Sequence, residues 1–356
     1  MTGTRLEALR HTMRSSRLDA LLITHLPHVR YLTGFSGSNA ACLLTQGSLW
    51  LGTDPRYATQ VEEEVHEARI IVVHGPLGMA LLRRSRLGRR ARIGYERFRV
   101  STGSFDQLRS VRPGTIWRGI DGLVDDLISV KSDEEIAAIR AAAKITDKVF
   151  SELLQWIRPG MREADVVAEI SYRQRRLGAE GDAFEPIVAS GVRGALPHAR
   201  ATSKRLRRGE MVTLDFGCVV DGYCSDMTRT VALGRISPQL RSMYDAVLAA
   251  QLSGLMAVRA GVPARAVDAI SRAVLKQRKL HRWFRHSLGH GLGIEVHEVP
   301  RLAPRSGDTL QEGQVVTVEP GVYLPGVGGV RIEDDVVVTR SGVELLTHSS
   351  KDLIVL

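Results

Sequence analysis

The chain has 356 residues, a net charge of +10 and a pI of about 9.9, and its 44% hydrophobic and 25% charged residues are typical of a globular protein. No run approaches the roughly 20 apolar residues that a membrane-spanning helix needs, which excludes a membrane protein. The densest basic stretch, residues 83–92, has no aromatic residue among its arginines for base stacking, so we expect no nucleic-acid partner. This length predicts two domains, or one large domain plus an extension.

The N-terminus and the cysteines favour a cytoplasmic protein. The first 24 residues include basic positions but no uninterrupted apolar stretch before a small-residue cleavage site, so they do not resemble a secretory signal. Cys42, Cys218 and Cys224 make no paired metal-binding spacing, and Cys218 and Cys224 fall on opposite faces of a predicted hairpin, which disfavours a disulfide between them. A reducing compartment is consistent with this pattern.

The first third of the chain alternates predicted helices and strands. The expected helices cover residues 4–16, 55–65 and 77–84, and the expected strands cover residues 19–24, 39–45, 48–54, 68–73 and 90–96. Alternation of this kind predicts an α/β layer domain, which we place at residues 1–127.

A boundary at residues 125–131 precedes a second domain, residues 128–356. Ser132 and Glu135 have the spacing of a capping box, which predicts a helix running to about Trp156. A second helix is expected over residues 163–177, and Ser237-Pro238 predicts the start of a long third one. The string RPGM at residues 158–161 is echoed by RAGV at residues 259–262, and each precedes a helix and then a strand pair. We therefore expect two similar halves with a site on the pseudo-twofold axis between them.

A predicted hairpin in this domain carries two acidic residues. Asp221-Gly222 between apolar-rich runs is a strong signal for a two-residue turn, which pairs Val220 with Tyr223 and Gly217 with Asp226. Asp215 then shares a face with Asp226, roughly 7–8 Å away on the diagonal. Acidic residues facing water are the alternative, but two like charges on one face repel unless a cation lies between them.

A second strand–turn–strand unit, around residues 314–339, has Glu319 on one arm and Glu333 on the other. Asp215, Asp226, Glu319 and Glu333 together with His290 make a set of four carboxylates and one imidazole. Such a set suits two hard or borderline divalent ions. Arg331 lies two residues before Glu333 and so on the same strand face, where we expect it to orient the acidic cluster by a charge-assisted hydrogen bond. An ordinary surface ion pair is the alternative for Arg331.

The motifs LDFG, SDMTRT, HSLGHGLGIEVHE, TVEPGVY and RIEDD resemble, in order, those of the pita-bread metallopeptidases, which include methionine aminopeptidase, aminopeptidase P and prolidase. The resemblance covers residues 130–356 closely. It implies that Asp215 is a terminal ligand of one metal, that His290 and Glu319 are terminal ligands of the other, and that Asp226 and Glu333 bridge both. The shorter strings YLTGFSGSNA and TDPRY look like the N-terminal domain of aminopeptidase P. The expected fold is therefore a creatinase-like α/β domain followed by an α+β pita-bread domain with pseudo-twofold halves.

Three further histidines match the proline-directed members of that family. His198, His286 and His297 stand at positions that line the substrate pocket in the resembled enzymes. A single histidine beside apolar residues is more often structural, but the joint occurrence of all three at the family's spacings favours substrate binding. The resemblance implies that Glu319 carries the proton and that His198 and His297 stabilise the tetrahedral intermediate.

The implied activity is hydrolysis of Xaa-Pro bonds in short proline-containing peptides, by an Xaa-Pro aminopeptidase or, as the alternative, an Xaa-Pro dipeptidase. A non-catalytic binding protein on the same fold is a third reading, which the complete ligand set disfavours. The expected cofactors are two divalent ions, Mn²⁺ first and otherwise Co²⁺, Zn²⁺ or Fe²⁺. We also expect a homodimer.

Overall fold

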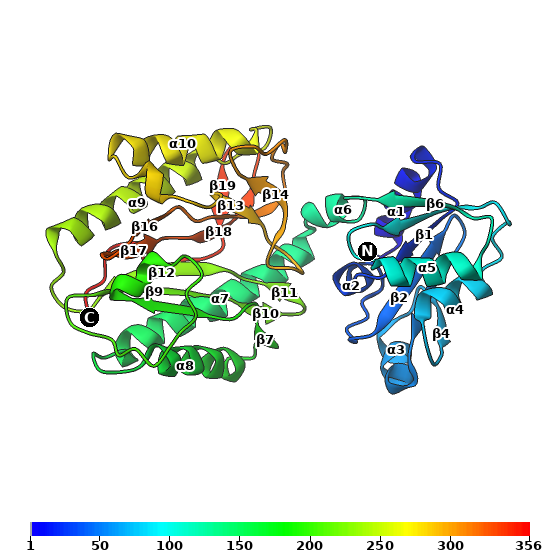
Figure 1. The fold of residues 1–356 in the computed structure, drawn as a ribbon, viewed down its shortest axis with the longest axis horizontal. Helices are drawn as coiled ribbons and strands as arrows, with labels where there is room; N and C mark the ends of the chain where they lie inside the picture. Colours follow the sequence, from blue (N-terminus) through cyan, green and yellow to red (C-terminus); the bar gives the residue numbers. More distant parts are fainter. Residues whose placement is uncertain (1) are drawn as a thin grey trace. The chain divides into compact units, whose positions relative to one another are not determined.

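The computed structural model describes residues 2–356 and divides into two compact units, residues 1–128 and 129–356. Each unit has its own sheets and its own hydrophobic core (Figure 1). None of the helices among the described residues is long and apolar enough to cross a membrane.

The N-terminal unit is built on one mixed six-stranded sheet in the order β4-β3-β2-β1-β5-β6. Its strands are β1 (Ala20–Ile23), β2 (Ala40–Thr45), β3 (Leu49–Thr53), β4 (Arg69–Val72), β5 (Arg92–Glu96) and β6 (Ile116–Ile120). Its helices are α1 (Thr2–Ser15), α2 (Leu26–Thr33), α3 (Ala58–Glu64), α4 (Leu77–Arg84), α5 (Thr102–Val111) and α6 (Asp125–Ser129), with a 3₁₀ turn at Pro55–Tyr57.

The expected strands and helices of this unit are present with small shifts of their ends, but α2, α5, β6 and α6 were not predicted. Strand β2 runs antiparallel to β1 and β3, whereas β5 runs parallel to β1 and β6. Parallel neighbours need a crossover between them, and α5 lies in the β5–β6 connection.

The second unit contains four long helices and several small sheets. The helices are α7 (Asp133–Trp156), α8 (Glu163–Arg176), α9 (Pro238–Ala257) and α10 (Ala264–Gln277), with 3₁₀ turns η2 (Gly191–Ala195) and η3 (His281–Trp283). The strands are β7 (Gly181–Asp182), β8 (Ile187–Ser190), β9 (Met211–Phe216), β10 (Cys218–Val220), β11 (Tyr223–Cys224), β12 (Met227–Ala232), β13 (Gly289–Gly291), β14 (Glu298–Leu302), β15 (Val315–Val318), β16 (Gly321–Leu324), β17 (Gly328–Arg331), β18 (Asp334–Val338) and β19 (Val343–Leu345).

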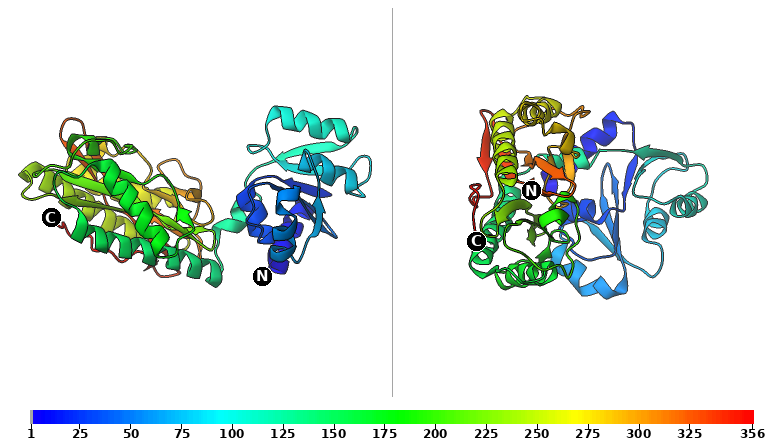
Figure 2. Two further views of the ribbon diagram at one scale, coloured as in Figure 1. Left: turned by 90° about the horizontal axis from the view of Figure 1, so that it is seen from below. Right: turned by 60° about the vertical axis from the view of Figure 1, so that its left-hand side comes forward.

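Local signals explain where the helices of this unit begin. Ser132 and Glu135 form the predicted capping box of α7, and Ser237 caps α9 with proline in its first turn. In the left view of Figure 2, α7 and α8 (green) lie over one face of this unit's strands. Helices α9 and α10 pack against each other and against strands β14 to β17 of the C-terminal half (Figure 1).

The predicted internal repeat is visible in the backbone hydrogen bonds that precede α8 and α10. In each half, a short segment before the helix pairs with a segment far along the chain through the same three bonds. These bonds are Gly160 N to Leu206 O, Leu206 N to Met161 O and Glu163 N to Lys204 O in the first half, and Gly261 N to Leu310 O, Leu310 N to Val262 O and Ala264 N to Asp308 O in the second. The two halves therefore enter their second helices in the same way.

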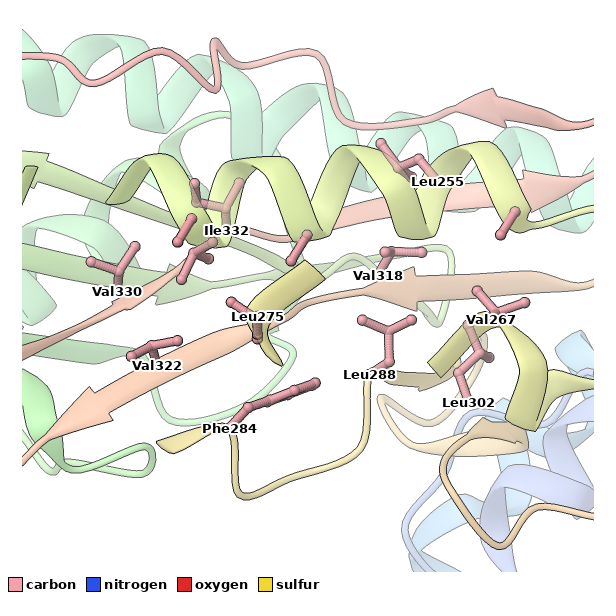
Figure 3. Close-up of a cluster of buried hydrophobic side chains, with 14 of the residues drawn as sticks. Leu255, Val267, Leu275, Phe284, Leu288, Leu302, Val318, Val322, Val330 and Ile332 are labelled. Carbon is pink, nitrogen blue, oxygen red and sulfur yellow. The ribbon is translucent and has the colours of Figure 1, made fainter. Parts of the chain in front are cut away.

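Each half also has a hydrophobic core of its own. In the C-terminal half, buried side chains from α9, α10 and the neighbouring strands form one cluster, in which Val267, Leu288 and Val318 lie close together (Figure 3). In the other half, α7 and α8 pack on β8, β9 and β12. These two cores fix the strands whose ends carry the acidic residues.

Candidate metal centre and substrate cavity

One cavity of about 490 Å³ in the second unit brings together every candidate site residue predicted from the sequence. The residues that the prediction and the cavity share are His198, Asp215, Asp226, His286, His290, His297, Glu319, Arg331 and Glu333. Apolar side chains, including Phe184 and Val296, complete the lining. A cavity of this size can hold a short peptide.

Two interrupted hairpins place the four carboxylates. In the first, Val220 pairs with Tyr223 as predicted, and the same register continues from β10–β11 into β9–β12, so that Asp226 lies opposite Gly217 and diagonally across from Asp215. Asp221 and Gly222 both have positive φ, as a type I′ turn requires.

The second hairpin repeats this arrangement. Val318 pairs with Asp334 in β15–β18, and Gly321 pairs with Arg331 in β16–β17, both in one continuous register. Glu319 and Glu333 occupy the break between these two ladders and lie opposite each other. Each hairpin thus opens at the point where its acidic residues face the cavity.

His290 completes the cluster from the short strand β13. Its Nε2 lies 3.4 Å from Glu319 Oε1 and 3.8 Å from Asp226 Oδ2, and one ligand atom each from Asp226, His290 and Glu333 lie within 4.8 Å of one another. Its Nδ1 lies 3.0 Å from the carbonyl oxygen of Gly291. A proton on Nδ1 that is donated to that carbonyl leaves the Nε2 lone pair facing the carboxylates, which is the orientation of a metal ligand.

Burial and crowding perturb the pKa values of these groups. Burial, and then the charge of a neighbouring carboxylate, raises the pKa of Asp226 and Glu319 well above the usual values and that of Glu333 to about 8. Burial lowers the pKa of His290 to about 4, so the imidazole is neutral. A neutral imidazole has a free lone pair, so beside buried carboxylates it is suited to bind a divalent cation.

Two carboxylate oxygens of the cluster point to the same conclusion. Asp215 Oδ1 and Asp226 Oδ1 are buried without a hydrogen-bond partner among the residues that the structure describes. Buried carboxylate oxygens normally accept hydrogen bonds, because an unsatisfied buried acceptor costs free energy. These residues therefore fit divalent ions, which would take up the unshared oxygens.

Arg331 is the cation that holds this cluster together. Its guanidinium donates to a carboxylate oxygen of Asp215, to Thr228 Oγ1 at 3.0 Å and to the Tyr323 hydroxyl at 2.7 Å. Only 3% of Arg331 is exposed, so it is not a surface ion pair. Thr228 in turn donates to Glu333 Oε2 at 2.6 Å. The predicted charge-assisted bond to the acidic cluster is thus present, with Asp215 as the partner.

A second layer of buried polar groups supports the strands from behind. Asp335 Oδ2 accepts the backbone N–H of Asp226 at 2.8 Å. Asp334 is fully buried and accepts bonds from four side chains, which are Arg229, Gln251, Thr347 and Lys351. These bonds fix the backbone that directly follows Glu333, so its direction into the cavity is set by the fold.

The three histidines occupy different parts of the cavity. His286 Nε2 lies 2.8 Å from the Tyr323 hydroxyl, and its Nδ1 lies 3.7 Å from Glu319 Oε2. The His297 ring is exposed and its centroid lies 4.4 Å from that of His290. His198 is also exposed on the cavity wall. His286 thus lines the cavity with both ring nitrogens close to protein groups, whereas His198 and His297 are more exposed to a ligand.

The segment that carries His198 is fixed by a close backbone contact. Gly329 in β17 lies so close to Gly194 that a Cβ on it would come within 1.9 Å of the Gly194 carbonyl oxygen. Arg331 Nη1 also donates to the carbonyl of Pro197 at 3.1 Å. The acidic cluster and the His198 segment are thus held by the same arginine.

Sequence reasoning did not assign a role to Tyr323, Thr228 or Arg301. Tyr323 pairs with Gly329 and is a diagonal neighbour of Arg331, so a correct hairpin register would have found it. Arg301 pairs with His290 across β13–β14, next to a bulge that no local signal predicts. Its guanidinium lines the cavity and makes no hydrogen bond or ion pair with another side chain of the described chain.

The sequence matches two family models. The model for metallopeptidase family M24 matches residues 137–340, and the model for the creatinase/prolidase N-terminal domain matches residues 5–130. An uncharacterized peptidase of Bacillus subtilis is 40% identical over 352 residues, which cover 99% of this chain and 100% of the relative.

Two solved structures extend the likeness to the whole fold. An Xaa-Pro dipeptidase from Bacillus anthracis has a TM-score of 0.95 and 37% identity, with both chains fully covered. An X-Pro aminopeptidase from Thermotoga maritima has a TM-score of 0.88 and 37% identity, over 96% of this chain and 100% of the other. This chain belongs to metallopeptidase family M24, with a creatinase-type N-terminal domain followed by a pita-bread catalytic domain.

Proposed function

We propose that this metallopeptidase hydrolyses Xaa-Pro bonds with two divalent ions. Asp215 would hold one ion, His290 and Glu319 the other, and Asp226 and Glu333 both. The observation that carries the proposal is the buried cluster of four carboxylates and one neutral imidazole, with unshared oxygens on Asp215 and Asp226, in a peptide-sized cavity. Two bound divalent ions supply a nucleophile at neutral pH and polarise the scissile carbonyl.

The side chains around the ions would position the peptide and move the proton. Glu319 lines the cavity with a side chain that is 15% exposed, so its carboxylate can take up a proton and deliver it to the leaving nitrogen. His198 and His297 are accessible on the cavity wall and would donate hydrogen bonds to the oxygen that gains negative charge.

Arg301 favours the dipeptidase form of this activity. Its guanidinium faces the cavity and lies close enough to His290 and His297 to lower the pKa of both rings, although burial is the larger cause in each case. A dipeptide carries its C-terminal carboxylate on the proline itself, and an arginine without a side-chain partner is suited to bind that carboxylate. The relatives named above include both a dipeptidase and an aminopeptidase.

The Xaa-Pro aminopeptidase remains the second candidate, because the strings YLTGFSGSNA and TDPRY look like the N-terminal domain of aminopeptidase P. We further propose Mn²⁺ as the metal, since four carboxylates and one histidine suit it, with Co²⁺, Zn²⁺ or Fe²⁺ as substitutes. The expected homodimer is likewise a proposal.

The test compares Ala-Pro with Ala-Pro-Ala, using the Mn²⁺-loaded enzyme and the variant Arg301→Leu. We expect faster release of alanine from Ala-Pro, and a rise in KM for Ala-Pro of about 10- to 100-fold in the variant, the scale of one lost charged hydrogen bond. The KM for Ala-Pro-Ala should change less. Preference for the tripeptide would replace the dipeptidase with the aminopeptidase.

Bond specificity needs a further pair of peptides. The residue that follows the scissile bond is proline in Arg-Pro-Pro and alanine in Met-Ala-Ser. A cavity shaped for the prolyl amide should leave the alanyl bond largely intact, because a misfit of about 1 Å at the reacting centre costs roughly 10²-fold in rate. Faster release of methionine would contradict the Xaa-Pro assignment. Release from neither tripeptide would indicate an enzyme restricted to dipeptides, which the Ala-Pro assay decides.

A further inference from the structure

A buried ion pair joins the start of the catalytic unit to the loop that carries His297. Lys131 Nζ lies 2.7 Å from Glu298 Oε2, and the two side chains are 0% and 7% exposed. Glu298 follows His297 directly and is the first residue of β14. Lys131 Nζ also donates to the carbonyl of Ser129 at 3.1 Å, so the lysine is held on two sides.

The Glu298 carboxylate is fixed at its other oxygen by the same loop. Glu298 Oε1 accepts the backbone N–H of Glu295 at 3.1 Å. Gly293 lies directly against this carboxylate, since a Cβ on Gly293 would come within 2.6 Å of both carboxylate oxygens. The carboxylate is therefore enclosed between the ammonium group of Lys131 and the backbone of residues 293–295.

The segment that bears Lys131 is itself bonded to the catalytic unit. The backbone N–H of Lys131 donates to the carbonyl of Gly313 at 2.9 Å, and Val130 forms a bridge with Gln314. Gln314 directly precedes β15, whose C-terminal end leads to Glu319. Lys131 therefore reaches Glu298 from a fixed backbone, and the loop of residues 292–297 is tied to the strand that leads to the acidic cluster.

We infer that Lys131 and Glu298 are positioning residues for His297, a role that rests on the proposed function of that histidine. Unlike the rings of His290 and His286, the exposed His297 ring makes no hydrogen bond to another residue among residues 2–356. Its place therefore depends on the backbone that carries it. The ion pair fixes that backbone on the C-terminal side of the ring. Without the pair, the loop and the histidine would move away from the reacting carbonyl.

The experiment is a double-mutant cycle on the Mn²⁺-loaded enzyme with Ala-Pro as the substrate. Lys131→Met should lower kcat by about 10- to 100-fold, because a displacement of about 1 Å at a reacting group costs up to roughly 10²-fold. KM and the metal content should change little. In a His297→Ala background, Lys131→Met should lower kcat by less than about twofold, because the residue through which it acts is already gone.

A second readout separates positioning from general stability. Amide exchange of the peptide covering residues 292–299 should accelerate in Lys131→Met, while exchange elsewhere in the unit stays the same. Lys204→Met is the matched control, since it removes a Lys–Glu pair of the same 2.7 Å length in the same unit, and neither Lys204 nor Glu210 lines the cavity. It should leave both kcat and the exchange of residues 292–299 unchanged.

Folding of the variants does not limit the test. If Lys131→Met does not fold because Glu298 is left buried and unpaired, the neutral double variant Lys131→Met with Glu298→Gln replaces it, since it buries no charge. That variant should keep the loss of kcat, because the amide does not reproduce the ionic bond.

Two results would overturn the inference. An unchanged kcat in Lys131→Met or in the neutral double variant is one, and an equal loss of kcat with and without His297 is the other. Other results would contradict the proposed function itself. These are a wild-type enzyme that does not cleave Ala-Pro and a His297→Ala variant that is fully active.

Discussion

Replacement of Glu333 should change the metal content, the activity and the pH dependence of stability. Glu333 is 2% exposed, accepts a 2.6 Å bond from Thr228, and has a pKa raised to about 8 by burial and by the charge of Asp215. Glu333→Gln keeps the size and the bond from Thr228 but removes the charge. We expect the variant to bind at most one metal ion per chain and to be inactive, because a bridging carboxylate serves both ions.

The same substitution should change the stability of the metal-free protein with pH. A carboxyl group whose pKa is raised in the folded state stabilises the fold below its unfolded pKa and loses that contribution as pH rises through the folded pKa. For Glu333 the window runs from 4.5 to about 8. At about 1.4 kcal/mol for each pH unit, the loss is at most about 5 kcal/mol. In a domain of about 150–250 residues this corresponds to roughly 10–20 °C in Tm.

The assay is thermal unfolding of chelator-treated protein at pH 5 and pH 8.5. Wild-type protein should lose more Tm over this interval than Glu333→Gln does. Glu312→Gln is the control, since its carboxylate is 53% exposed and should leave the wild-type behaviour unchanged. An equal loss of Tm in wild type and Glu333→Gln would refute the reasoning that buried carboxylates repel one another in the empty cluster.

Three further predictions address other contacts of the structure. Arg331→Lys should lower kcat/KM by about 10- to 100-fold, because an ammonium group cannot reproduce the forked hydrogen bonds of the guanidinium. One hydrogen bond that involves a charged group contributes about 1.5–3 kcal/mol. Unchanged kinetics would contradict this prediction. Tyr323→Phe should keep both metals, measured by elemental analysis, and lose about tenfold in kcat/KM, because the Arg331 donor is left without its 2.7 Å acceptor; metal loss would show a different role. In the N-terminal unit, burial lowers the pKa of His28 but the bonds to Asp125 and Glu96 outweigh it and raise the pKa to about 9. Stability from this ring is present below pH 6.5 and is lost as pH rises through 9, so the Tm of that unit should fall over this range in wild type and less in His28→Gln; parallel curves would contradict the assignment.

Local signals were sufficient to place two of the acidic residues, Asp215 and Asp226. The Asp221-Gly222 turn fixes the register of its hairpin, and that register alone places Asp215 and Asp226 on one face. The caps at Ser132 and Ser237 likewise predicted the starts of two long helices. Turn and cap signals both act within a few residues, so the sequence reveals them directly.

Features that depend on contacts between distant segments were not predictable from the residues. Helix α2 begins after His25 without a side-chain cap, and Glu96 from a distant strand accepts the N–H of His25 instead. Arg301 reaches the cavity only because β14 pairs with β13 across a bulge. The pairing of Lys131 with Glu298 joins positions 167 residues apart, and no pattern in the sequence marks it.

The central claim is that the cluster holds two metal ions that both depend on Asp226. The most direct measurement is the metal content of the purified chain by elemental analysis, in wild type and Asp226→Asn, together with the rate of Ala-Pro hydrolysis before and after chelation. The account predicts about two ions per chain in wild type, at most one in the variant, and activity only in the metal-loaded wild type. Two ions in Asp226→Asn, or full wild-type activity after the ions are removed, would contradict it.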